Sequence, residues 1–492
     1  MRSSGILLPI SALPSNYGIG TVGKEACDFI DWLEKCKQRF WQILPIGPTG
    51  YGDSPYQSFS AYAGNPYWID LDILASEELL TSAEIKKSGL RQNPGFIDYG
   101  DLYEKRFELL RKAAFRISPS DEGFLCFCRE NQRWIFGYAL FMALKVENGM
   151  APLHLWPEKE RSRDSKTMEE AAKRLKDEMH FWSALQYLFY RQWRRFKEYA
   201  NSKAVMIIGD IPIYVSPDSS DLWENYRLFQ ANSKMELKYI AGCPPDYFNV
   251  TGQRWGNPLY DWDYHRKTGY DWWIKRLTHA GEVFDVVRID HFRGFAGYYS
   301  IPAENETAEY GEWKKGPGKK FISAILEKAP GLRIIAEDLG FLTPDVRRLL
   351  EFSGFPGMKV LQFAFDPSAE SDYLPHKYPE NSVAYTGTHD NPTTREWVDT
   401  AQRSEWEFAK RYLKVNKKSD LADEIVRAAM LSKSNLCIIP LQDWLRLGKT
   451  ARINTPGTTD GNWRFRVRKA MLSEESARKI RLLTEESGRA EM

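Results

Sequence analysis

Eight short segments rich in β-branched and aromatic residues recur along this chain of 492 residues, and helical patterns separate several of them. The segments are 5–10, 41–45, 205–211, 286–290, 334–337, 358–365, 383–386 and 437–441. Strands that alternate with helices form a parallel sheet buried on both faces, and eight such units favour a closed barrel over an open sheet. No Gly-x-Gly-x-x-Gly directly follows a segment, because the pattern at 18–23 begins eight residues beyond the end of the first one, and this argues against the tight strand–turn–helix of a dinucleotide site. The predicted fold class is therefore α/β, a (β/α)8 TIM barrel.

The spacing of the segments is uneven, and it predicts how the chain is divided. About 160 residues separate the second segment from the third, far more than a helical crossover needs. We expect the barrel over 1–60 and 201–470, with a large, mainly helical insertion after strand 2 at 61–200. Further rim insertions after strand 3, at 211–283, are rich in Pro, Gly, Asp, Asn and aromatic residues and are predicted to be loops of a substrate cleft. Residues 471–492 are predicted to form a C-terminal helix and a frayed tail.

Charge and cysteine content exclude several classes of function. Lys and Arg number 68 and Asp and Glu 66, so a formal charge of +2 provides no strong field for nucleic acid or an anionic membrane. The six cysteines lack the paired spacing of zinc sites, so we expect no metal and no cofactor. No apolar run approaches the roughly 20 residues that span a bilayer, and we expect a cytoplasmic protein. The 14% aromatic content suits stacking on sugar rings, although a large core would use the same residues.

Three of the predicted strands lead into an acid: Asp290, Glu337 and Asp390. The carboxyl ends of barrel strands meet at one rim, where such folds carry their chemistry. Carboxylates gathered there are typical of a site that cleaves glycosidic bonds. The alternative is that all three are ordinary strand-end acids that cap the helices after them.

The neighbours of these acids predict different proton affinities. Arg288 and Asp290 share one face of their strand, and an adjacent Arg lowers a carboxyl pKa by about 1 to 3 units, which suits a nucleophile. Glu337 follows an apolar run, which raises the pKa and suits a general acid. His389 and Asp390 could hold the hydroxyls of the sugar at the cleavage point. Structural roles stay open for each: an ion pair closing the barrel, a cap on the next loop, or a satisfied His–Asp pair.

Several motifs resemble those of a known family. Three are similar to the catalytic-strand motifs of the α-amylase clan: Arg-Ile-Asp-His at 288–291, Ala-Glu-Asp-Leu at 336–339 and Gly-Thr-His-Asp at 387–390. Four further stretches, 52–61, 209–215, 244–248 and 251–260, resemble the 4-alpha-glucanotransferases, which are the amylomaltases or disproportionating enzymes of glycoside hydrolase family 77. The resemblance runs from about residue 5 to residue 465.

This resemblance implies a retaining 4-alpha-glucanotransferase that moves a segment of a 1,4-α-D-glucan to the 4-hydroxyl of glucose or of another 1,4-α-glucan through a covalent glycosyl-enzyme. Asp290 would be the nucleophile, Glu337 the acid/base and Asp390 the transition-state stabiliser. The implied substrate-binding residues are Tyr56, Asp210, Asp246, Tyr247, Phe248, Trp255, Asn257, Arg288, His291, His389 and Asn391, with Tyr51 at a second glucan contact. The implied partners are α-1,4-glucans and maltooligosaccharides, with neither nucleic acid nor membrane, and the chain is expected to be a monomer.

Other functions stay open on the sequence. A hydrolase would use the same carboxylates with water as the acceptor. A glucan-binding protein without activity would be expected to lack one of the three acids, and an unrelated metal or cofactor enzyme would need clustered His, Cys or Gly. The sequence does not give the preferred donor and acceptor lengths, the ratio of hydrolysis to transfer, whether cyclic glucans are made, or the physiological pathway.

Overall fold

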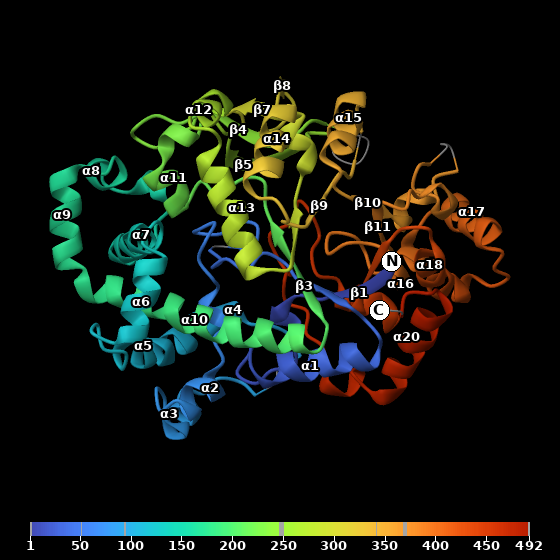
Figure 1. The fold of residues 1–492 in the computed structure, drawn as a ribbon, viewed down its shortest axis with the longest axis horizontal. Coiled ribbons are helices and arrows are strands. Elements are labelled where there is room, and N and C mark those ends of the chain that lie inside the picture. Colours follow the sequence, from blue (N-terminus) through green and yellow to red (C-terminus); the bar gives the residue numbers. More distant parts are fainter. Residues whose placement is uncertain are drawn as a thin grey trace.

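A closed barrel of eight parallel strands forms the centre of the molecule in a computed structural model that describes residues 2–50, 52–92, 95–245, 250–340, 342–367 and 371–490 (Figure 1). In barrel order the strands are β1 (Ser3–Leu7), β2 (Phe40–Gln42), β3 (Met206–Ile211), β6 (Val286–Ile289), β9 (Ile334–Ala336), β10 (Gly357–Val360), β11 (Ser382–Tyr385) and β12 (Leu436–Pro440). Pairing of β12 with β1 closes the ring. Each of the eight predicted segments overlaps one strand, so the predicted (β/α)8 barrel is confirmed.

Alternation of side chains along the strands decides which residues face the barrel interior. In β3, Ile207 packs into the main core, whereas Ile208 packs with Val286 in a second cluster to which all eight strands contribute. The same parity carries Asp210 in β3 and Arg288 in β6 to the inner face, where the two residues are register partners. The parity of short buried strands therefore brings charged side chains into the carboxyl end of the barrel.

Helices connect the strands and surround them (Figure 1). Those outside the segment between β2 and β3 are α1 (Lys24–Lys35), α11 (Ser220–Glu224), α12 (Trp262–Lys267), α13 (Asp271–Val283), α14 (Gly318–Lys328), α15 (Pro344–Ser353), α16 (Thr394–Thr400), α17 (Arg403–Leu413), α18 (Leu421–Leu431), α19 (Leu441–Trp444) and α20 (Glu474–Glu486). Local sequence explains their ends. Helix α15 begins at Pro344, whose fixed φ suits a first turn, and ends at Gly354, which adopts a φ of 68° that favours glycine.

The chain between β2 and β3 carries a group of helices on one side of the barrel (Figure 1). They are α2 (Leu71–Ser76), α3 (Ser82–Lys87), α4 (Tyr99–Asp101), α5 (Phe107–Phe115), α6 (Glu122–Glu130), α7 (Ile135–Glu147), α8 (Glu158–Arg161), α9 (Ser165–Arg174) and α10 (Lys176–Ser202). Helix α10, with 27 residues, packs against α5, α6 and α7 through a buried apolar face. Its Phe196 ring lies 5.8 Å from Trp41 of β2, and the Trp193 indole donates to the Val283 carbonyl at 3.0 Å. These contacts fix the helical group to the barrel wall.

A second sheet, which the sequence did not predict, lies beyond the barrel. Its strands run antiparallel in the order β5 (Gln253–Pro258), β4 (Tyr239–Cys243), β7 (Gly297–Pro302) and β8 (Glu312–Lys315). Strands β4 and β5 fall in the 211–283 stretch where only loops were expected. Their small core comprises Ile240, Tyr299, Ile301 and Ala308. Because β7 and β8 come from a separate segment, local sequence pattern could not reveal the pairing.

The C-terminal residues are anchored, so the predicted frayed tail is wrong for the chain up to residue 490. After α20, Arg489 is fully buried. Its guanidinium donates to the main-chain carbonyls of Ser3, Met430, Ser432, Ser434 and Asn435. Main-chain acceptors leave no mark in the sequence, which explains why polar composition alone suggested fraying.

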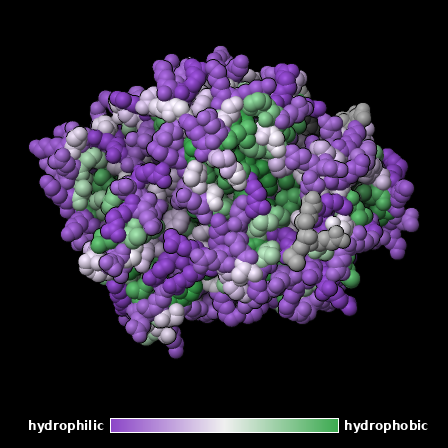
Figure 2. Space-filling view, in the orientation of Figure 1, coloured by the Kyte–Doolittle hydropathy of each residue, from purple (hydrophilic) through white to green (hydrophobic). Residues whose placement is uncertain are grey.

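The outer surface is largely hydrophilic on the face shown in Figure 2, where hydrophobic residues gather near the middle of the upper half. Within the described ranges, no helix combines the length and apolar content needed to cross a bilayer.

Candidate active site

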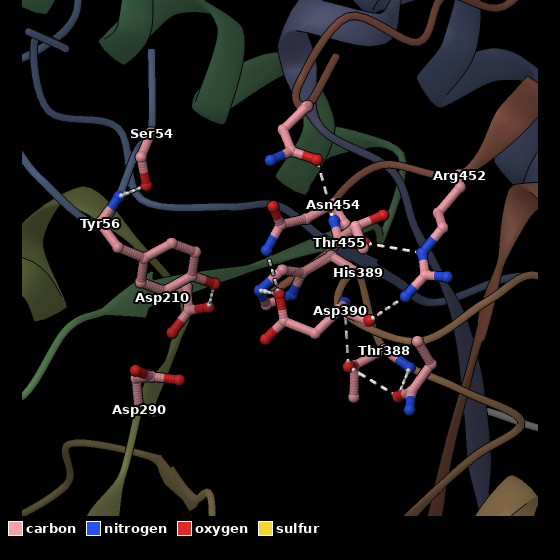
Figure 3. A network of polar contacts seen from close by, with 12 residues as sticks. Ser54, Tyr56, Asp210, Asp290, Thr388, His389, Asp390, Arg452, Asn454 and Thr455 are labelled. Atoms are coloured by element: carbon pink, nitrogen blue, oxygen red, sulfur yellow. Dashed lines mark hydrogen bonds and ion pairs between the residues drawn. The ribbon is translucent and has the colours of Figure 1, made fainter. Parts of the chain in front are cut away.

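Four acids from four strands meet at the carboxyl rim of the barrel. Asp210 belongs to β3, Asp290 and Glu337 directly follow β6 and β9, and Asp390 lies in the loop after β11. Main-chain hydrogen bonds between neighbouring strands continue up to this rim. The Asp290 N–H donates to the carbonyl of Ile211, and the Glu337 N–H donates to the carbonyl of Ile289, each at 3.0 Å. Figure 3 shows the carboxylates of Asp210, Asp290 and Asp390 around a common space.

Arg288 links two of these acids. Its Nη1 lies 2.5 Å from an Asp210 oxygen and its Nη2 lies 3.1 Å from an Asp290 oxygen, while its side chain is only 3% exposed. The Tyr56 hydroxyl donates to the same Asp210 oxygen at 2.7 Å. One buried guanidinium therefore fixes the positions of two carboxylates, which matches the geometry that arginine provides best.

Asp290 combines partial exposure with strong electrostatic coupling. Its side chain remains 29% exposed, with Arg288 as its ion-pair partner. Burial raises the pKa of Asp290 well above its usual value, Arg288 lowers it, and the charges of Asp210, Glu337 and Asp390 raise it further. The sequence predicted a lowered pKa from Arg288 alone. That direction is wrong for the net shift, because local sequence does not count the carboxylates that other strands bring to the same place.

Glu337 is held by main-chain donors. The N–H of His291 donates to Oε2 at 2.6 Å and the N–H of Leu339 to Oε1 at 2.7 Å, and the residue is 8% exposed. Burial raises the pKa of Glu337, while Arg288 and the two N–H groups lower it. The net rise has the direction that the apolar flanks predict. His291 adopts a left-handed backbone, with a φ of 51°, which turns its N–H toward the carboxylate.

Asp390 is the most exposed acid of the predicted catalytic trio, with 46% of its side chain accessible. Its Oδ1 lies 3.3 Å from Nε2 of His389 and accepts a hydrogen bond from the Asn454 amide at 2.6 Å. Arg452 donates to the Asp390 carbonyl at 3.1 Å. His389 and Asn454 thereby both contact Oδ1 of the carboxylate, while Arg452 anchors the main chain of the same residue (Figure 3).

Aromatic rings form the wall of the rim next to the acids. The rings of Tyr56 and His389 stack at 5.1 Å with an interplanar angle of 15°, and Trp463 packs 6.1 Å from each. On the side of β5, the Trp255 ring meets His291 edge to face at 4.8 Å. Flat aromatic faces flanked by carboxylates suit pyranose rings, whose apolar faces stack and whose hydroxyls need acceptors.

Comparison with known proteins identifies the family. A model of the 4-alpha-glucanotransferase family matches residues 8–472. The chain belongs to this family. It is 45% identical over 485 residues to the 4-alpha-glucanotransferase of Clostridium butyricum, covering 98% of this chain and 100% of that protein, and 44% identical over 501 residues to that of Thermus thermophilus, covering 99% of each. The amylomaltase from Streptococcus agalactiae, solved in complex with acarbose, matches with a TM-score of 0.96 at 38% identity, covering 99% of this chain and 100% of that one.

Two asparagines were predicted to bind substrate from the resemblance to 4-alpha-glucanotransferases. The side chains of both make hydrogen bonds to main-chain groups of the protein. The Asn257 amide donates to the Val215 carbonyl at 2.8 Å, and the residue is 6% exposed. The Asn391 side-chain oxygen accepts from both the N–H and the hydroxyl of Thr388. The structure thus gives both residues a part in shaping the rim. Four other assigned residues lie outside the described chain, and their roles stay predictions: Tyr51, Asp246, Tyr247 and Phe248.

The sequence missed three residues of this 4-alpha-glucanotransferase site. Arg452, Asn454 and Trp463 all follow the last barrel strand and return to contact the loop that carries Asp390 or the rings beside it. They belong to no strand-end pattern, and no periodicity distinguishes them. Only their contacts with the rim identify them.

Proposed function

We propose that this chain is a retaining 4-alpha-glucanotransferase that moves a segment of a 1,4-α-D-glucan to the 4-hydroxyl of glucose or of another 1,4-α-glucan. One observation carries the proposal: two carboxyls on neighbouring strands are held differently, Asp290 by an ion pair with Arg288 and the buried Glu337 by main-chain donors. A retaining mechanism uses two carboxyls in different roles, one as the nucleophile and the other as the acid/base, and requires them to lie about 5 to 5.5 Å apart.

The first half-reaction forms a covalent intermediate. A carboxylate oxygen of Asp290 attacks the anomeric carbon of the donor glucan. Glu337 gives its proton to the glycosidic oxygen as the carbon–oxygen bond breaks, so the leaving segment departs with a free 4-hydroxyl and the donor segment stays bound to Asp290 as an ester. Arg288 favours charge on Asp290 over charge on Glu337, because its guanidinium contacts the Asp290 carboxylate directly.

The second half-reaction reverses the first with another acceptor. Glu337, now ionised, takes the proton of an incoming 4-hydroxyl, whose oxygen attacks the anomeric carbon and displaces Asp290. Two displacements at one carbon give net retention. Asp390 lies beside the sugar ring and strengthens its attraction as positive charge develops there, and Asn454 keeps its carboxylate in place.

Transfer must compete with attack by water. Tyr56, His389 and Trp463 form one aromatic wall and Trp255 contributes to the other, which supports binding of a glucan acceptor in place of solvent. Incubation with maltotriose tests this. We expect longer oligomers to appear while the number of reducing ends stays constant. A steady rise in reducing ends without longer products would identify a hydrolase and refute the transfer proposal.

The nucleophile can be tested directly. A fluorinated glycosyl fluoride that forms the intermediate quickly and releases it slowly should label the enzyme once, and peptide mass spectrometry should place the label on Asp290. Labelling of Asp390 or Asp210 instead would refute the assignment. The Asp290→Asn variant is the matched control and should remain unlabelled.

We also propose that the chain acts as a cytoplasmic monomer. The six cysteines form no disulfide within the described residues, which suits a reducing compartment. Light scattering during size-exclusion chromatography should give a mass near 57.0 kDa. A mass of twice that value would contradict the monomer.

A further inference from the structure

A groove of about 970 Å³ lies between α12, β8 and the N-terminal ends of α14 and α15. Among the described residues proposed for the glucan site, none lines this groove. Its described lining is strongly basic, with seven Lys and Arg residues against two Asp residues. Such an excess of one sign contrasts with the near-neutral chain and marks a local field for an anion.

Several of these cations have no hydrogen-bond or ion-pair partner in the described part of the chain, although Nζ of Lys319 lies 4.9 Å from the ring centroid of Phe352. Both acids of the groove are already paired, Asp263 with Arg266 at 2.7 Å and Asp345 with Arg348. Lys314 pairs with Glu312, which lies on the same strand. The side chains of the remaining four make neither a hydrogen bond nor an ion pair to any residue within the described ranges: Arg293, Lys315, Lys319 and Lys320.

Arg293 gives the strongest indication of a ligand. The residue is only 9% exposed, yet its Nε is buried without a hydrogen-bond partner. Its guanidinium lies 4.3 Å from the ring centroid of Trp313, which is itself 47% exposed at the groove. Burial lowers the pKa of Arg293 because the charged form loses hydration. Leaving a buried guanidinium nitrogen without a hydrogen-bond partner is costly, and an anion bound to this guanidinium in the groove would offset that cost.

Helix α14 adds main-chain donors to the same groove. This helix has 11 residues, its N-cap is Pro317, and no side chain caps its first turn. Free N–H groups and the helix dipole make such an end attractive to anions. Lys319 and Lys320 lie in this first turn, which contains no acidic residue. Cations at a helix N-terminus oppose the helix dipole and weaken the helix. An anion that binds both the lysines and the N–H groups of this end explains why the lysines lie there.

We propose that this groove binds a phosphate monoester of glucose, either a free sugar phosphate or a phosphorylated unit of a glucan. The phosphate would be held by Arg293, by Lys319 and Lys320, and by the N–H groups at the N-terminus of α14. The groove is larger than an inorganic ion requires, and the exposed indole of Trp313 offers an apolar face to a sugar ring. Binding requires neither Asp290 nor Glu337, so the proposal stands apart from the transfer reaction.

Calorimetric titration of the full chain at constant ionic strength tests the proposal. Glucose 6-phosphate or glucose 1-phosphate should bind at one site per chain, inorganic phosphate about tenfold more weakly, and glucose not at all. The Lys319→Gln/Lys320→Gln variant should weaken binding by about tenfold or more. The matched control, Lys166→Gln/Lys173→Gln on α9, makes the same charge change on exposed residues and should bind normally. Phosphorylated maltodextrin compared with phosphatase-treated maltodextrin distinguishes the glucan source from the free sugar.

Three outcomes would overturn the proposal. One is the absence of binding by either sugar phosphate at concentrations up to about 10 mM. Another is an equal loss of affinity in the α14 and α9 variants, because the loss would then result from the change in net charge and not from a site at α14. The third is competition by neutral maltotriose, which would place the ligand in the glucan cleft. The two α14 lysines are exposed, so their variant should fold, and unchanged thermal unfolding checks this.

Discussion

Asn454 offers the sharpest test of how the site is built, because no sequence pattern predicts it and one hydrogen bond defines its role. Its amide donates to Oδ1 of Asp390 at 2.6 Å. A hydrogen bond to a charged group contributes about 1.5 to 3 kcal/mol. Asp390 is 46% exposed, so water replaces part of the lost bond, and we discount the effect of Asn454→Ala to about 1 to 2 kcal/mol. If that free energy is expressed in the transition state, kcat/KM falls by about 5- to 30-fold.

The assay is the initial rate of transfer from maltotriose, measured for wild type and variant across donor concentrations. Asn462→Ala is the matched control: Asn462 accepts from the Thr455 N–H at 2.9 Å in the same segment but has no bond to Asp390. We expect the control to retain activity within about twofold. An Asn454→Ala variant with wild-type kinetics would refute the reasoning. Equal losses in both variants would also refute it, because loop order would then be the cause.

Other predictions concern the charged groups. Glu337→Gln should reduce transfer from maltotriose by about 100-fold or more, but much less with a glycosyl fluoride, whose leaving group needs no proton. Burial raises the pKa of Glu337, so this acid keeps its proton to a higher pH. The fall of kcat/KM at alkaline pH should therefore report the loss of the Glu337 proton. The Glu337→Gln variant, assayed with the fluoride donor, should not show this fall. Arg288→Met leaves buried Asp210 unpaired and should cost about 3 to 5 kcal/mol of stability, partly restored by adding Asp210→Asn, as thermal unfolding would show. Arg489→Ala should cost about 2 to 4 kcal/mol without reducing the transfer rate at 25 °C, whereas Arg481→Ala, at an exposed position of the preceding helix α20, should cost under about 1 kcal/mol.

The sequence was sufficient for the barrel because each strand carries its own signal. A short β-branched run between helical patterns, such as 286–290, needs no distant partner to be read as a buried parallel strand. Parity within the strand then assigns Arg288 and Asp290 to one face. The second sheet gave no such signal, because Tyr239–Cys243 and Gln253–Pro258 are stabilised by pairing with each other and with β7.

For the candidate site, the sequence located the acids but not their environment. Glu337 lies in a locally apolar run, so the upward direction of its pKa shift could be predicted from its neighbours. The pKa of Asp290 could not, because the carboxylates that raise it come from other strands. The sequence also does not show that the side-chain oxygen of Asn391 accepts hydrogen bonds from Thr388, while the role of Asn391 in substrate binding stays a prediction.

By itself, the sequence determined which segments become strands, the face to which each side chain points, and the three acids delivered to one rim, since these depend on local periodicity and strand ends. Only the tertiary structure decided which charges oppose each other, that Asn454 and Arg452 return from beyond the last strand to hold Asp390, and that Nε of Arg293 is buried without a hydrogen-bond partner. Electrostatic energy depends on distances in space, and residues far apart in the chain acquire those distances only when the barrel closes.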